Sequence, residues 1–147
     1  MAQINKPNLH FNTKVYTGTG SATSITGVDF QPDWVWIKRR NASTSNTLFD
    51  VIRGTTKRIM TNETAAEETD AQTLTAFDTD GFSLGTNTSV NSSGSSHVSF
   101  NWKAANSQGS SNTDGSINTT YTSVNTTSGF SISQYIGTGS NATIGHG

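Results

Sequence analysis

Apolar and polar residues alternate in short runs along this chain of 147 residues, which is typical of β-strands that pack one face against a core. The clearest run is HVSFNWKA, which begins at His97. Its apolar set is predicted to face the core and its polar set the solvent: Val98, Phe100 and Trp102 against Ser99, Asn101 and Lys103. This run therefore predicts a strand with one wet face.

Comparable runs divide the rest of the chain into strands separated by Gly, Asn, Ser and Pro turns. Further strands are predicted at 11–16, 25–30, 34–37, 48–53, 73–77, 82–84, 117–124 and 129–135. The helical signal is confined to a weak turn at 63–68. A parallel α/β architecture needs amphipathic crossover helices, which the sequence lacks. The prediction is an all-β single domain, an antiparallel β-sandwich or jelly roll.

The apolar positions of these runs define a predicted core. In the first strand, Val15 shares its side with Phe11 and Thr13 and is placed inward. The full predicted core consists of Val15, Val35, Ile37, Phe82, Phe100, Trp102, Phe130 and Ile132. The core is modest, because only 31% of the residues are hydrophobic, and neighbouring subunits are expected to contribute to stability.

Composition narrows the class of protein further. Ser, Thr, Asn and Gly make up about half of the chain, a bias that fits either disorder or a β-fold with many turns. The recurring aromatic residues favour the β-fold. With a net charge of −1 and no cysteine, we expect no nucleic-acid or membrane partner, no disulfide and no thiol chemistry. No pattern of a signal peptide or membrane span is present.

Two groups of residues are candidates for contacts with a partner. Trp34 and Trp36 lie two apart and hence on one face of a strand, where paired rings either stack on sugar or pack in a core or interface. Val35 lies between the two tryptophans and Ile37 follows them, so the other face of this strand is apolar too. This favours packing in a core or an interface. The basic candidates are Lys38, Arg39, Arg40 and Arg53, with Lys57 and Arg58 close behind. They are interpreted as solvated strand ends or subunit contacts, and Asp50 is expected to pair with Arg53 or to fix a turn.

No catalytic, cofactor or metal site is predicted. The histidines, His10, His97 and His146, are scattered without metal-ligand spacing. Asp78, Asp80 and Gly81 resemble the start of a calcium loop but lack the later Glu, so a turn is expected there. Nothing in the sequence matches a nucleophile elbow or a pair of catalytic carboxylates. We therefore expect a protein that is not an enzyme.

Several motifs in a fixed order resemble a known family. They are VYTGTGSATSITG, DWVWIKRR, LFDVIRG, FDTDGFSLGT, HVSFNWKA and SGFSISQYIGTGSNATIGHG. Together they resemble a domain found, often in tandem, in structural proteins of tailed bacteriophages, especially marine ones, and the resemblance covers nearly the whole chain from Phe11. It implies a concanavalin-like β-sandwich in a tail fibre, an appendage or a capsid-attached protein.

The resemblance also implies a domain organisation. Residues 1–10 form an N-terminal extension, 11–135 the β-sandwich, and 136–147 a segment that resembles the start of a second repeat, because YIGTGS at Tyr135 matches YTGTGS at Tyr16. This last segment is expected to be a remnant or to complete a neighbouring subunit.

The expected function is a non-enzymatic structural role in the virion, assembled in the host cytoplasm, with other copies of the chain and other virion proteins as partners. Two alternatives remain open. One is a carbohydrate-binding module that attaches to a host-surface glycan through exposed aromatic rings. The other is a self-polymerising extracellular fibre subunit that donates the strand segment 132–144 to the next copy. Exposure of Trp34 and Trp36 separates the first alternative from the structural role.

Overall fold

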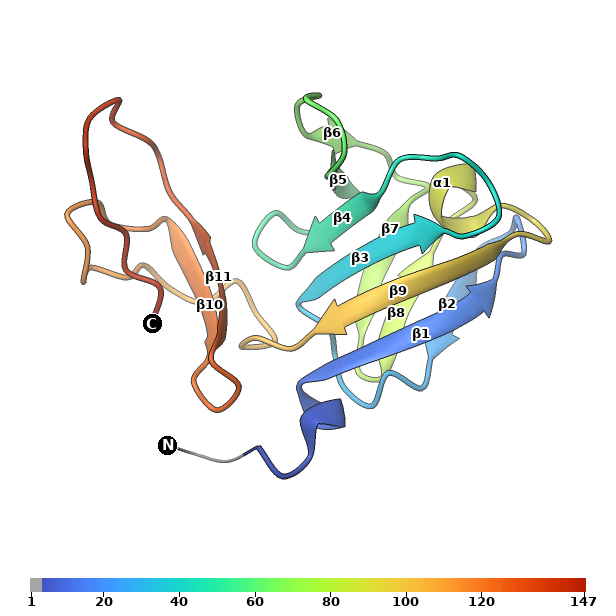
Figure 1. Cartoon of the computed structure of the whole chain (residues 1–147), viewed down its shortest axis with the longest axis horizontal. Coiled ribbons are helices and arrows are strands. Elements are labelled where there is room, and N and C mark those ends of the chain that lie inside the picture. Colours follow the sequence, from blue (N-terminus) through green and yellow to red (C-terminus); the bar gives the residue numbers. More distant parts are fainter. Residues whose placement is uncertain (1–3) are drawn as a thin grey trace.

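The protein is an all-β antiparallel sandwich with a small β-hairpin beside it, as the computed structural model of residues 4–147 shows (Figure 1). The predicted all-β antiparallel β-sandwich is therefore confirmed. Its strands are β1 (Phe11–Thr17), β2 (Thr23–Thr26), β3 (Trp34–Arg39), β4 (Thr47–Asp50), β5 (Lys57–Met60), β6 (Glu68–Thr69), β7 (Leu74–Asp78), β8 (Gly81–Leu84), β9 (Ser96–Trp102), β10 (Tyr121–Asn125) and β11 (Phe130–Gln134).

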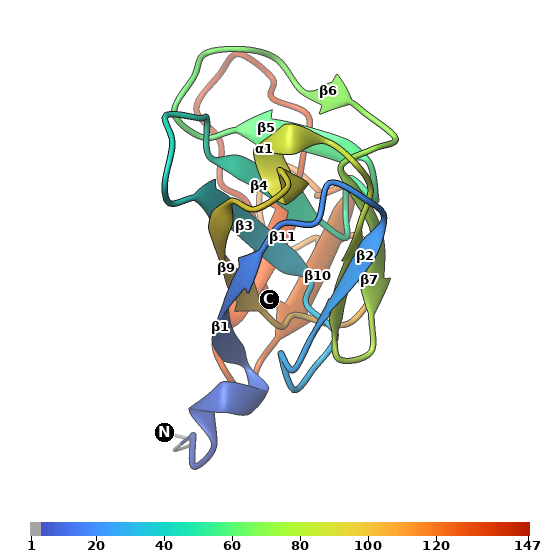
Figure 2. The same ribbon diagram turned by 90° about the vertical axis from the view of Figure 1, so that its right-hand side faces the viewer.

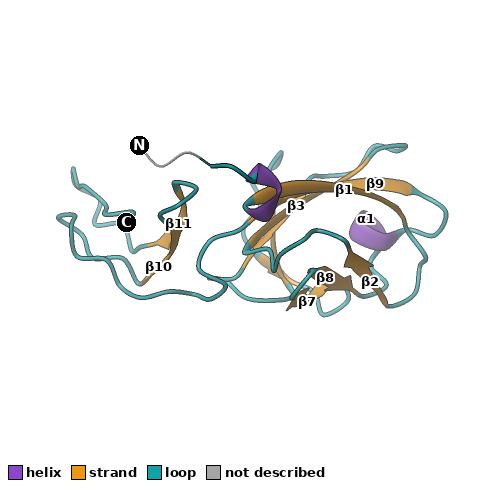
Figure 3. Ribbon diagram, turned by 90° about the horizontal axis from the view of Figure 1, so that it is seen from below, coloured by secondary structure: helices purple, strands orange, loops and turns teal. Residues whose placement is uncertain are grey.

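Two sheets form the layers of the sandwich. The larger sheet has six strands in the order β1-β9-β3-β4-β5-β6, and the smaller has three in the order β2-β8-β7. Seen from below, β1, β9 and β3 lie in one layer and β2, β8 and β7 in the other, with the short helix α1 (Thr88–Asn91) between them (Figure 3). The hairpin β10-β11 is a separate two-stranded sheet at one end.

The core lies between the two sheets. Its buried members are Ile25, Val35, Ile37, Phe49, Leu74, Phe82, Leu84 and Val90. The predicted core residues Val35, Ile37 and Phe82 are all fully buried here. Ile132 is also buried, but in a second cluster with Val51, Ile52 and Ala104, against which Trp34, Phe77 and Phe130 pack.

The orientation predicted for the strand at 97–104 is wrong. In β9 the polar residues His97, Ser99 and Asn101 are fully buried and face the smaller sheet. Phe100 and Trp102 lie half-buried on the opposite face of the sheet. Alternation along a strand defines two faces but does not reveal which one is inside. Because both faces of this sheet are partly covered, apolar side chains are found on either one. The rule that apolar side chains face the core therefore does not identify the inner face of β9.

Val15 and Phe130 also depart from the predicted core. Val15 is 58% exposed, because it shares the outer face of the six-stranded sheet with Phe100, and the inward residue at this end of β1 is Tyr16. Phe130 is half-buried and comes from the hairpin, where it packs onto the outer face instead of filling the space between the sheets.

Hydrogen bonds and stacking make the polar interior of β9 tolerable. Asn101 donates to the carbonyl of Asn12 at 3.0 Å and to the Ser99 hydroxyl at 3.1 Å. The His97 ring stacks on Tyr16 with centroids 5.1 Å apart and planes 9° apart. The Tyr16 hydroxyl donates to the Val90 carbonyl at 2.7 Å. These contacts satisfy part of the polar row, while Asn101 Oδ1 and His97 Nε2 have no hydrogen-bond partner within the described residues.

Several boundaries differ from the sequence prediction. The turn of helix expected at 63–68 is wrong, since this part of the chain is a loop leading into β6. The helices are instead η1 (Pro7–Leu9), which Figure 2 shows beyond the start of β1, and α1, capped by the Asn87 side chain. The strand β5 was not predicted, and β2 is shorter than expected because Gly27 and Asp29 adopt positive φ.

The C-terminus of the chain lies beside the hairpin β10-β11 (Figure 1). Of the predicted extension 1–10, residues 1–3 lie outside the described residues. The segment 136–147 contacts its own chain: Ile144 forms a parallel bridge with Ile117, and the Thr143 amide donates to the Ser116 hydroxyl at 2.9 Å. Among residues 4–147, neither helix has the length and apolar character required to cross a membrane.

Candidate functional site

All three tryptophans of the chain lie on the outer face of the six-stranded sheet, which we call the aromatic face. Alternate residues of three adjacent strands point to this side, away from the core between the sheets. They are Phe11, Thr13 and Val15 of β1, Val98, Phe100 and Trp102 of β9, and Trp34, Trp36 and Lys38 of β3. Leu48 and Asp50 of β4 and Ile59 of β5 continue the face.

Strand register brings the rings into contact across the sheet. Phe11 and Trp34 both lie opposite Trp102, and Trp36 lies opposite Phe100. The ring centroids of Phe11 and Trp102 are 4.6 Å apart, and those of Trp36 and Phe100 are 5.3 Å apart. Pairs at these separations are worth about 0.5–1.5 kcal/mol beyond the apolar area that they bury. The face is thus a stable, preformed surface.

Trp34 and Trp36 share one face, as their spacing predicts, and both are half-buried. The Trp36 indole donates through Nε1 to the Thr61 hydroxyl at 3.1 Å. The indole rings are therefore held in place by neighbours, while part of each remains accessible.

The hairpin β10-β11 covers one end of the aromatic face. The Phe130 ring meets Trp34 edge-on, with centroids 6.3 Å apart and planes at 84°, and stacks on Trp102 at 6.1 Å and 21°. Ile132, two residues further along β11, is 8% exposed. The other end, around Phe100, Val98 and Val15, has no such cover within the described residues, and Val15 is the most exposed of these three side chains.

A groove of about 330 Å³ separates the hairpin from strands β3 to β5. Trp34 and Tyr135 contribute aromatic surface to it, and Asp50, Arg53 and Gln134 contribute polar groups. Its remaining lining residues are Leu48, Ile52, Ile59, Ile132 and Ser133. The groove thus combines apolar walls with a few polar side chains, as small-molecule sites do.

The expected ion pair of Asp50 and Arg53 is present at the base of this groove. Arg53 Nε lies 2.6 Å from Asp50 Oδ2, and Arg53 Nη1 lies 3.5 Å from a Glu67 oxygen. Arg53 also donates to the Leu48 carbonyl at 3.2 Å, and the Asp50 carboxylate accepts the Arg53 amide at 2.9 Å. The side chains of Asp50 and Arg53 are 6% and 11% exposed, so this pair is desolvated and fixes the turn after β4.

The basic residues singled out in the sequence do not join into one patch. Lys38 donates to the carbonyl of Thr44, Arg39 to the Asn41 side chain at 3.4 Å, and Arg40 to the Ser96 hydroxyl at 3.1 Å. Each of these contacts is local to the end of β3. Arg53 lies at the other end of the sheet, in the groove.

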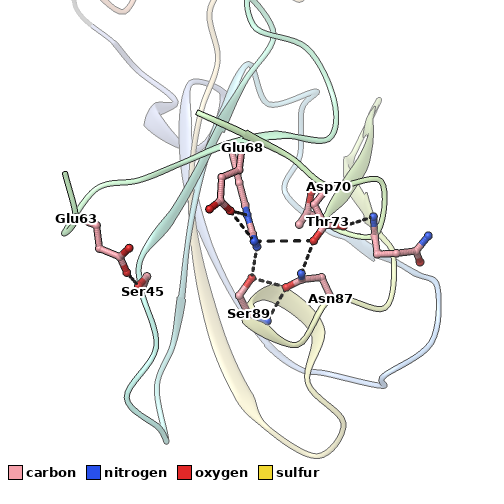
Figure 4. A network of polar contacts seen from close by, with 9 residues as sticks. Ser45, Glu63, Glu68, Asp70, Thr73, Asn87 and Ser89 are labelled. Carbon is pink, nitrogen blue, oxygen red and sulfur yellow. Dashed lines mark hydrogen bonds and ion pairs between the residues drawn. The ribbon is translucent and has the colours of Figure 1, made fainter. Parts of the chain in front are cut away.

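Arg58 anchors a separate polar network between β5, β6 and α1 (Figure 4). It contacts Glu68 at 2.9 Å and the Ser89 hydroxyl at 3.2 Å. Asp70 continues the network through Asn87, whose side-chain amide donates to it at 2.6 Å. Because these charges pair with one another, we interpret this network as structural.

Asp33 is a buried group that sequence reasoning missed. Its carboxylate is fully buried and accepts the amides of Ala104 and Asn106 at 2.6 and 3.0 Å. Burial raises the pKa of Asp33, and the two backbone hydrogen bonds and nearby Lys103 oppose this shift. The residue ties the start of β3 to the connection that leads to the hairpin. An acidic residue between Pro32 and a strand apolar on both sides was the available signal.

Two further titratable groups are perturbed. Burial raises the pKa of the Tyr16 phenol and lowers that of His97, so both remain neutral near pH 7. At the predicted turn after β7, the amides of Gly27 and Asp29 donate to Asp80 at 3.0 and 2.7 Å and hold the pKa of this carboxylate below its usual range. The turn thus joins β8 to the loop after β2. Within residues 4–147, no cluster of three or more His, Asp or Glu side chains is placed to bind a metal.

The fold and this face define an antiparallel β-sandwich with a preformed aromatic surface on one sheet. Over residues 6–147 the chain matches a family described as a domain of unknown function, DUF7483, and it belongs to that family. No curated protein and no solved structure matches the chain.

Proposed function

We propose that this chain is a non-enzymatic structural protein of a bacteriophage virion, a capsid decoration or a tail fibre or appendage component, and that it acts through protein–protein contacts. The resemblance of its ordered motifs to phage structural domains supports the virion setting and a concanavalin-like lineage for the sandwich. The chain's partners are other copies of itself and other virion proteins.

The observation that carries the proposal is the open end of the aromatic face. Val15 is 58% exposed there, and it lies opposite the half-buried Val98 of β9, on the same face as the half-buried ring of Phe100. Contiguous apolar surface of this kind is uncommon on monomers and marks interaction sites. Aromatic residues in a fixed arrangement are also the side chains that supply most binding energy at protein interfaces.

The test is the composition of virions purified from the phage that encodes the chain. We expect mass spectrometry to find the protein in intact particles, and a Val98→Glu variant, which charges the open end of the face, to be depleted from them. Thr75→Glu is the matched control, because Thr75 is exposed on the smaller sheet, away from the aromatic face. Absence of the wild-type protein from particles would refute the proposal.

A carbohydrate-binding role is the second candidate, and the groove favours it. Trp34 and the 51% exposed Tyr135 offer ring surface for a sugar, and Asp50, Arg53 and Gln134 offer acceptors and donors for hydroxyl groups. We expect a glycan array to identify a ligand whose binding is lost in Tyr135→Ala and in Gln134→Ala. Tyr121→Ala is the control, because Tyr121 is an exposed tyrosine outside the groove lining. Binding that survives both groove variants would refute this role.

The third candidate, a fibre subunit that donates residues 132–144, requires these residues to leave their present partners. Ile132 now lies opposite Ser123 in the hairpin, and Ile144 bridges to Ile117 of the same chain. Donation would exchange these contacts for equivalent ones in a neighbour. A length series of fibres seen by electron microscopy would support it, and particles of uniform size would count against it.

A further inference from the structure

The six-stranded sheet ends in β1, a seven-residue edge strand whose outward backbone groups have no strand partner within the described residues. The amide of Lys103 donates to the carbonyl of His10 at 2.9 Å, and the amide of Gly18 donates to that of Ser95 at 2.8 Å. Both bonds fit the register of β1 with β9, so the even-numbered residues of β1 use their backbone groups on β9.

The odd-numbered residues of β1 therefore direct their N–H and C=O groups away from the sheet. These residues, Phe11, Thr13, Val15 and Thr17, are also the ones whose side chains lie exposed on the aromatic face. One of the four amides, that of Thr13, is bonded to the Asn12 side chain at 2.9 Å. Of the devices that proteins use to block pairing at such edges, the strand has neither proline nor a bulge, and its one charged residue, Lys14, lies on the face opposite to Phe11, Thr13 and Val15.

We propose that β1 pairs antiparallel with β1 of a second copy of this chain, around a two-fold axis that passes beside Thr13. The two six-stranded sheets then join edge to edge into one sheet. This inference rests on the proposed role in assembly and names the contact that brings two copies together. Because the axis is perpendicular to the sheet, both aromatic faces lie on the same side of the joined sheet and form one platform for other virion proteins.

The pattern of side chains selects this register. With Thr13 opposite its own copy, Phe11 lies opposite Val15 of the second copy, so the two most exposed apolar residues of the strand cover each other on both sides of the axis. On the other face of the sheet, Lys14 lies opposite Asn12 of the second copy. Shifting the axis to Lys14 would place two lysines directly opposite each other, and like charges in this position are destabilising.

The first measurement is the molar mass of the purified full chain by analytical ultracentrifugation over a wide range of concentration. We expect a reversible dimer, and a dissociation constant raised about tenfold or more by Val15→Pro, because one outward amide is lost from each copy. The bonds of β1 to β9 do not use this amide, so urea midpoints should confirm that the variant folds. Ile136→Ser, at a side chain 79% exposed outside β1, is the matched control and should leave the dimer unchanged.

The second measurement fixes the register by cross-linking, since the chain has no cysteine of its own. Directly paired residues in a hydrogen-bonded antiparallel pair lie about 5.5 Å apart between Cα atoms, within disulfide range. Thr13→Cys should therefore form a covalent dimer under mild oxidation. Val15→Cys should not, because its two copies would lie about 13 Å apart along the strands.

Three outcomes would overturn the inference. They are a chain that remains monomeric at every concentration, a dimer that Val15→Pro leaves intact, and cross-linking through Val15→Cys in place of Thr13→Cys. None of these results bears on whether the protein is present in purified particles. Failure of the β1 contact and failure of the virion role are thus measured separately.

Discussion

The contact between Phe130 and the aromatic face is expected to hold the hairpin β10-β11 on the sandwich. Phe130 is the residue of β11 whose ring touches both Trp34 and Trp102. Replacing it with alanine removes both ring contacts and uncovers that end of the face. We expect the hairpin to loosen while the core between the two sheets, to which Phe130 does not belong, stays folded.

The magnitude follows from burial and ring geometry. Truncating a fully buried Phe to Ala costs roughly 3–5 kcal/mol, and Phe130 is half-buried, so we expect a loss of about 2–3 kcal/mol in the free energy of unfolding. Of this, the stacked pair with Trp102 should account for about 0.5–1.5 kcal/mol of pairwise coupling.

A double-mutant cycle measures this coupling. The variants are Phe130→Ala, Trp102→Ala and the two together, each unfolded in urea and followed by far-UV circular dichroism. Hydrogen exchange on the Phe130→Ala variant should show faster exchange of the hairpin amides than of those in β3 and β8. Such a difference would mark local release of the hairpin.

The control is a second cycle between Trp102 and Tyr121, which is 36% exposed on the other strand of the hairpin. This cycle should be additive within about 0.5 kcal/mol. Equal coupling in both cycles, or no coupling between Phe130 and Trp102, would refute the view that Phe130 docks the hairpin.

Three further predictions concern the buried polar groups and the tight turns. Stability should fall as the pH drops below about 6.5, because burial lowers the pKa of His97 in the folded state and the unfolded chain then binds a proton that the folded chain does not. The fall in urea midpoint between about pH 7.5 and about pH 5.5 should be smaller in the His97→Gln variant than in the wild type. An equal fall in both proteins would contradict this prediction. Gly81→Ala should cost more than about 2 kcal/mol, since φ is +147° and a Cβ would lie 1.9 Å from the Ile25 carbonyl oxygen. Gly94→Ala, at φ +69° with open space around it, should cost only about 1 kcal/mol, and equal thermal shifts for the two would show that the close approach is unimportant. Asp33→Ala should lower the free energy of unfolding in urea by about 2–4 kcal/mol, because two buried backbone amides lose their acceptor. Asp33→Asn keeps an oxygen in this place and should lower it less. An alanine variant as stable as the wild type would contradict this role of Asp33.

Several features of the fold were predictable from local pattern. The runs around Trp34, Phe82 and Phe130 are strands because alternation and turn residues act over a few neighbouring positions. The turn before Gly81 was also predictable, since an Asp-Gly sequence supplies the positive φ that such a turn needs. The pairing of Asp50 with Arg53 followed from their spacing of three residues.

The candidate site was only partly predictable. The spacing of Trp34 and Trp36 placed them on one face, but their neighbours Phe100 and Phe130 come from strands far along the chain. Asp33 went unrecognised because its partners lie about seventy residues away, and its role depends on two backbone amides that no side-chain pattern reveals.

By itself, the sequence determined that this protein is an antiparallel β-sandwich and where most of its strands lie, because strand propensity and turn chemistry are local. Only the tertiary structure decided which face of β9 is inside. Alternation is symmetric between the two faces of a strand, and the choice depends on what covers each face. Here the Asn101 side chain, on the inner face, donates to the Asn12 carbonyl and to the Ser99 hydroxyl. On the outer face the Phe100 ring packs on Trp36, and the Trp102 ring packs on Phe130 of the hairpin. That inversion creates the aromatic face.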